Sequence, residues 1–135
     1  MKLLFLSPYL PAPPRSGGPR RVHGLITELA RRHEVSFLAF TAPGEDTNEA
    51  IQATKKYCTT VVAVENDRVD RALALDRKRK RGIQLRSLLH TWSYERLIYH
   101  QPAFQRTLNN LLAQGDFDII TTESSFMAGY SLPRS

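Results

Sequence analysis

Residues 3–32 are LLFLSPYLPAPPRSGGPRRVHGLITELARR, and this stretch decides the fold. Its apolar run Leu3–Leu6 is typical of a strand that is buried on both faces. The strand ends in the prolines of Ser7–Arg15, because each proline removes a backbone donor from the sheet. Pro19 suits the first position of a helix, and apolar residues then follow at helical spacing as far as Arg32. That apolar face consists of Val22, Leu25, Ile26, Leu29 and Ala30.

The start of this helix has the features of an anion site. Gly17 and Gly18 allow a ligand to approach the backbone amides at the positive end of the helix dipole. A first helical turn usually carries acidic residues, but this one carries Arg20 and Arg21, with Arg15 just upstream. Two interpretations stay open, solvated arginines or an electropositive pocket for a phosphate. The residues of that candidate phosphate and substrate site are Arg15, Ser16, Gly17, Gly18, Arg20 and Arg21.

The remaining elements predict an α/β fold. Further buried strands are expected at Val35–Thr41, Thr59–Val64 and Asp116–Thr122, and a helix starting at Thr47 or Asn48 and ending near Tyr57 joins the first two. Strands linked by crossover helices form parallel sheets with right-handed connections. We therefore expect a Rossmann-like, doubly wound sheet of about four strands in the order 3-2-1-4, in which the fourth strand is an exposed edge.

Helices are expected between the third and fourth strands. A short helix with Val69, Ala72, Leu73 and Leu75 is expected to run into the basic residues and stop at Gly82. Another is expected over Ile83–His100, and a third from Pro102 to a stop at Gly115. The apolar side of the Ile83–His100 helix is formed by Leu85, Leu88, Leu89, Trp92 and Leu97.

Charge and length limit the classes of function. A chain of 135 residues fits one domain. Of its net charge of +6, five charges come from Arg77–Arg81, so the rest of the chain carries +1. No base-stacking platform or recognition module accompanies this run, so we expect no nucleic-acid partner. Two interpretations remain, a solvated helix end or loop, and attraction to an anionic membrane surface.

The cysteine and histidine residues indicate neither disulfides nor a metal site. Cys58 is alone, which excludes an intrachain disulfide and fits a reducing compartment, and we expect it as a small buried group near a helix end.

No apolar run approaches the roughly 20 residues of a membrane span. We expect a cytoplasmic protein, peripheral at the inner membrane face if the basic run binds lipid. The histidines show no metal-binding spacing, and the dinucleotide and P-loop signatures are absent.

The glycine loop and its helix are followed by the segment Arg32-His33-Glu34-Val35. In this pattern the chain resembles the N-terminal domain of GT-B glycosyltransferases of the retaining group-4 type, although the family usually has Gly in place of Arg32. The segment Phe117-Asp118-Ile119-Ile120 resembles a later strand of the family, so the likeness spans most of the chain. Other matching positions are Ser16, Gly17, Gly18, Arg21, Leu25, Leu29, Ala30 and Leu38.

The resemblance implies an enzyme with two Rossmann-like domains. In the family the N-terminal domain holds the acceptor, and a C-terminal domain binds the nucleotide-diphosphate-sugar donor. On this view residues 1–135 are a partial acceptor-side domain, inactive alone, without cofactor or metal, and the acceptor is a small molecule or a glycolipid. Gly17 and Gly18 match a loop that faces phosphate. Glu123 takes the place of a functional histidine of several members, which makes it the candidate catalytic residue.

A second hypothesis from another class stays open. The chain is then a non-catalytic α/β module that binds an anionic ligand or a membrane surface without turnover. Continuation of the reading frame into a second Rossmann-like domain would favour the enzyme.

Overall fold

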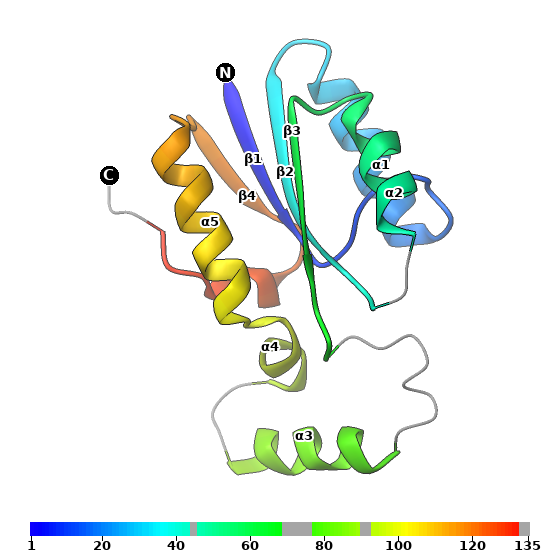
Figure 1. The fold of residues 1–135 in the computed structure, drawn as a ribbon, viewed down its shortest axis with the longest axis vertical. Coiled ribbons are helices and arrows are strands. Elements are labelled where there is room, and N and C mark those ends of the chain that lie inside the picture. The colour runs from blue at the N-terminus through cyan, green and yellow to red at the C-terminus, as the bar shows by residue number, and fades with distance from the viewer. Residues whose placement is uncertain (44–45, 69–76, 90–92, 133–135) are drawn as a thin grey trace.

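The fold is built on a four-stranded sheet in which every neighbouring pair is parallel (Figure 1). The computed structural model describes residues 1–43, 46–68, 77–89 and 93–132, without the side chains of 77–80. The strands are β1 (Lys2–Ser7), β2 (Glu34–Thr41), β3 (Thr60–Glu65) and β4 (Ile119–Thr122), and their order is β3-β2-β1-β4. The predicted α/β class and strand order are confirmed.

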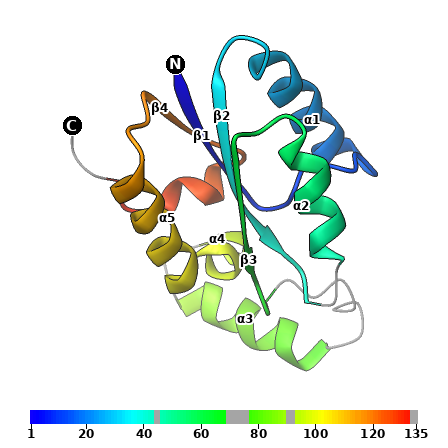
Figure 2. The same ribbon diagram turned by 45° about the horizontal axis from the view of Figure 1, so that its top comes forward.

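Helices cover both faces of the sheet (Figure 2). α1 (Gly17–Leu29) and α2 (Thr47–Lys55) lie on one face, and α5 (Pro102–Gln114) and the 3₁₀ helix η2 (Ser125–Gly129) lie on the other. Successive β1 side chains alternate between the two cores, as the strand repeat requires. Leu3 and Phe5 pack with Val22 and Ile26 of α1, whereas Leu4 and Leu6 pack with Phe104 and Leu108 of α5.

The first helix begins two residues earlier than predicted. Ser16 is its N-cap, so Pro19 is the third residue of α1. Proline fits there as well, because the first four N–H groups of a helix have no partner within the helix. Of the predicted apolar face, Val22 and Ile26 are buried, but Leu25 is 45% exposed.

The second helix is capped by Asp46, not by Thr47 or Asn48. The Asp46 carboxylate accepts a hydrogen bond from the Glu49 N–H at 3.2 Å. Asp is as good an N-cap as Ser or Asn, and it satisfies one of the unpaired donors of the first turn.

Residues 77–100 differ most from the prediction. α3 (Arg77–Leu89) passes through Gly82, and α4 (Tyr94–Tyr99) is a separate helix, so the predicted stop and the single helix Ile83–His100 are wrong. Glycine within a helix costs only about 1 kcal/mol, too little to end one. Ser93 starts α4 because its hydroxyl accepts from the Arg96 N–H at 3.3 Å. The predicted helix through Val69 and Leu75 lies outside the described residues, as does Trp92.

The predicted bounds of α5 and the predicted burial of Cys58 are confirmed. α5 starts at Pro102 and has Gly115 as its C-cap. Cys58 is buried with a free thiol, and burial raises its pKa to about 12. In the described part of the chain no helix is long and apolar enough to cross a bilayer.

A buried amide fastens β3 to the helices that follow. Asn66 is fully buried, donates from Nδ2 to the Ile98 carbonyl at 3.1 Å, and accepts from the Gln101 side chain at 2.9 Å. Its Oδ1 also accepts from the Arg68 N–H at 3.0 Å. Both Nδ2 and Oδ1 of Asn66 are therefore hydrogen-bonded within the protein. The bond to Ile98 links the end of β3 to α4.

Candidate functional site

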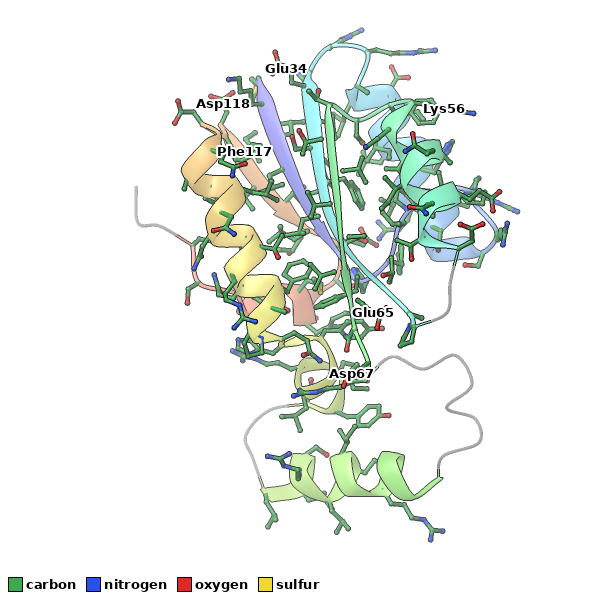
Figure 3. All side chains as sticks on the ribbon, in the orientation of Figure 1. Glu34, Lys56, Glu65, Asp67, Phe117 and Asp118 are labelled. Carbon is green, nitrogen blue, oxygen red and sulfur yellow. The ribbon has the colours of Figure 1, made fainter. Side chains whose placement is uncertain are left out.

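The candidate residues lie at the edge of the sheet where the parallel strands end. Figure 3 shows Glu34 and Asp118 at the end where β2 and β4 begin, and at the opposite end Glu65, the last residue of β3, and Asp67 just beyond it. The order β3-β2-β1-β4 changes direction between β1 and β4. Open α/β sheets bind ligands at the carboxyl ends of the strands beside such a switch point.

Glu123 is held beside the end of β1. It follows β4 directly, and its N–H donates to the Leu6 carbonyl at 2.8 Å. Its side chain is only 11% exposed and accepts from the Arg21 guanidinium and, at 3.3 Å, from the Tyr9 hydroxyl. Ser124, the next residue, has φ of 83°, a conformation that is uncommon for any residue but glycine. The backbone turns sharply just after the carboxylate.

The structure thus joins two residues that the sequence assigned to different roles. Arg21 belongs to the predicted phosphate site and Glu123 is the predicted catalytic residue, yet they form an ion pair. The Arg21 side chain is 69% exposed. A guanidinium has five N–H donors, so Arg21 can remain bonded to Glu123 while its other donors meet a ligand. Glu123 therefore orients Arg21 and also compensates its charge.

Tyr9, Arg21 and Glu123 form one polar cluster, and Tyr9 is the member that was not predicted from the sequence. Its N–H and carbonyl both contact the Ser7 hydroxyl, at 3.3 and 2.7 Å, which fixes the loop just after β1. Its own hydroxyl reaches Glu123 and lies only 2.6 Å from the place of a Cβ on Gly18. Burial raises the pKa of the Tyr9 phenol, and the Glu123 carboxylate raises it further, so Tyr9 is a protonated donor.

The two glycines consequently differ in accessibility. Tyr9 covers Gly18, whereas nothing lies within 4 Å of a Cβ placed on Gly17. Ser16 caps α1 without a side-chain hydrogen bond, and the first turn contains no acidic residue. The open backbone at the start of α1 is therefore that of Gly17.

A pocket of about 540 Å³ adjoins this cluster on the side of α2. The loop after β1, the end of β2 and the start of α2 line it, and Tyr9 and Ser16 belong to its wall. Arg15 lines it too, but pairs with Glu49 at 3.4 Å, with Asp46 nearby in the same wall. This pocket thus holds two carboxylates against one guanidinium, which disfavours an anion and suits the hydroxyl groups of a neutral ligand.

The three predicted phosphate-site arginines therefore do not converge. Arg15 pairs with Glu49 in the wall of the pocket, and Arg21 pairs with Glu123. Arg20 is exposed and forms no ion pair with any residue in the described ranges. What remains of the predicted anion site is the open Gly17 backbone, the helix dipole and the outer donors of Arg21.

No metal site is evident in the part of the chain that is described. There, no group of three or more His, Cys, Asp or Glu side chains comes together. Whether the protein works without a metal stays a prediction.

The fold and the cluster define a class, an α/β protein with a polar cluster at the switch point of a parallel sheet. Comparison of the chain with family models, with curated proteins and with solved structures gives no match. The particular family therefore rests on the sequence resemblance alone.

Proposed function

We propose that this domain is the acceptor-side part of a glycosyltransferase that moves a sugar from a nucleotide-diphosphate sugar to an acceptor. The observation that carries the proposal is the start of α1. A strand delivers the chain to the carboxyl edge of the sheet, and the open Gly17 backbone then begins a helix with no acidic residue in its first turn. N–H groups at a helix start that have no acceptor within the helix donate to phosphate groups. The arrangement supports a phosphate contact beside Arg21.

In this proposal the pocket and the cluster have separate roles. The pocket beside α2 receives the hydroxyl-bearing acceptor, which Asp46 and Glu49 can bind as hydrogen-bond acceptors. Tyr9 lines this pocket together with Ser16 and Pro19 at the start of α1, and its hydroxyl reaches Glu123, so an acceptor hydroxyl in the pocket would lie near both this pair and a donor phosphate at the helix start. The donor itself is bound by a second domain, so the 135-residue chain alone is expected to transfer no sugar.

The test is a titration of this chain with inorganic pyrophosphate, in which the backbone amide chemical shifts measured by NMR report binding. We expect saturable shifts at Gly17 and Gly18. The variant Gly17→Val should weaken binding about tenfold or more, because its side chain stands where the anion approaches. Gly24→Val is the matched control, since Gly24 lies in the same helix and also has nothing within 4 Å of a Cβ. Equal affinities of both variants and the wild type would reduce the glycine loop to a turn.

Binding alone does not separate the enzyme from a non-catalytic module that holds an anionic ligand, because both would use the same amides. Sugar transfer by a protein that carries both domains separates them. Robust transfer by the isolated 135-residue chain would instead contradict the division of the site between two domains.

A further inference from the structure

Helix α3 exposes three leucines on one stripe. Leu85, Leu88 and Leu89 are 62%, 82% and 84% exposed, although the sequence places them together on the apolar side of a helix. Half-buried Ile83 and Ser87 lie on the other side of the helix, and α3 packs against α4. Single exposed leucines are ordinary, but three within two turns form an apolar surface that something normally covers.

The same helix carries all of the net charge of the chain. Between Arg77 and Leu89 there are six basic residues and no acidic one, and the whole chain has a net charge of +6. The remaining residues are therefore neutral in sum. Arg81 is exposed and lies four positions before Leu85, so it continues the leucine stripe toward the start of the helix.

The combination of charge and leucines selects one kind of partner. A nucleic acid would pair with the basic residues but leave the leucines in water. An apolar protein surface would cover the leucines but strip water from the charges around them, which is costly. A bilayer surface with anionic lipids offers negative headgroups above an apolar layer, so it accepts both.

We propose that α3 lies in the headgroup region of an anionic bilayer with Leu85, Leu88 and Leu89 in the outer acyl layer. Figures 1 and 2 show α3 beyond α4, at the end of the molecule where β3 finishes. Docking through α3 therefore turns the carboxyl edge of the sheet, which bears Tyr9 and Glu123, toward the membrane side. The proposal stands without sugar transfer, and its test does not depend on the glycine loop.

The experiment is cosedimentation of the full chain with vesicles of phosphatidylcholine, with and without phosphatidylserine. The wild type should bind the anionic vesicles more tightly than the neutral ones, and part of the binding should survive salt, because salt screens charges but not apolar contacts. Leu88→Ser with Leu89→Ser should weaken binding about tenfold or more. Leu25→Ser with Leu132→Ser is the matched control and should bind like the wild type, since these exposed leucines lie outside α3.

Charge is tested in the same assay. Arg81→Gln with Arg86→Gln should weaken binding to anionic vesicles, whereas Arg31→Gln with Arg32→Gln, exposed residues outside α3, should not. Circular dichroism checks that each variant is folded. Absence of wild-type binding, or unchanged binding of the leucine variant, would overturn the proposal. So would a dimer that the Leu88 and Leu89 changes convert to a monomer, because a second copy would then cover the stripe.

Discussion

At the scale of residues, Arg20 and Arg21 look equivalent in the sequence but have different surroundings. Arg21 partners the buried Glu123 carboxylate, whereas Arg20 is exposed and forms no ion pair within the described ranges. We expect Arg21→Ala to lower the free energy of unfolding by about 1–2 kcal/mol, because among the described residues it leaves the buried carboxylate with the Tyr9 hydroxyl as its side-chain donor. The mostly exposed guanidinium keeps this cost below that of a fully buried pair.

Arg20→Ala is the control, with an expected change within about 0.5 kcal/mol. Urea unfolding followed by circular dichroism measures both. If Glu123→Gln removes the difference between the two arginine variants, the ion pair is its cause. Equal destabilisation by both arginine variants would mean that the pair contributes nothing in solution.

The residue scale also shows why Tyr9 escaped prediction. Its hydroxyl contacts a carboxylate 114 positions away in the sequence. Periodicity and motif spacing describe neighbours within one element, so Gly17 and Arg21 could be nominated from the start of their helix, whereas Glu123 was nominated from the resemblance. The meeting of Arg21 and Glu123 depends on β1 and β4 being adjacent, and the predicted strand order contained that adjacency. The strand order does not predict, however, which way the Tyr9 side chain points from its proline-rich loop.

At the scale of elements, the start of α2 offers a direct comparison of the predicted and the observed cap. We expect Asp46→Ala to cost about 1 kcal/mol of stability, since it removes the acceptor of the Glu49 N–H. Asn48→Ala, which replaces one of the predicted caps, should change stability by less than about 0.5 kcal/mol because Asn48 is an exposed residue inside the helix. Thermal unfolding measures both, and a larger loss from Asn48→Ala would contradict the observed cap.

The first three strands were predicted better than the starts of α1, α2 and α4 for a physical reason, whereas β4 begins at Ile119, three residues after its predicted start at Asp116. A buried parallel strand is a continuous apolar run, and β1 and β2 differ from their predicted bounds by only one or two residues. The start of a helix depends on which of several neighbouring polar side chains makes the N-cap. Asp46 makes it for α2 and Ser93 makes it for α4. The leucines of α3 repeat at helical spacing, but spacing identifies an apolar stripe without saying what covers it.

At the scale of the whole molecule, the strand order predicts an uneven distribution of stability. β1 and β2 each have a strand on both sides and are buried by helices on both faces, with Leu4 and Phe37 fully buried. β4 has only β1 beside it in the sheet, and Ile119 is 45% exposed. Half of the amides of an edge strand point away from the sheet.

We therefore expect hydrogen exchange to be slowest in peptides from β1 and β2 and about tenfold faster or more in those from β4, because edge strands open without global unfolding. Mass spectrometry of the free chain measures this, with α3 as an internal reference for a helix that has an exposed apolar side. Exchange of β4 as slow as that of β1 would mean that the free edge is paired in solution. Dilution would then separate the two causes, since pairing with a second copy weakens as the protein concentration falls and pairing within the chain does not.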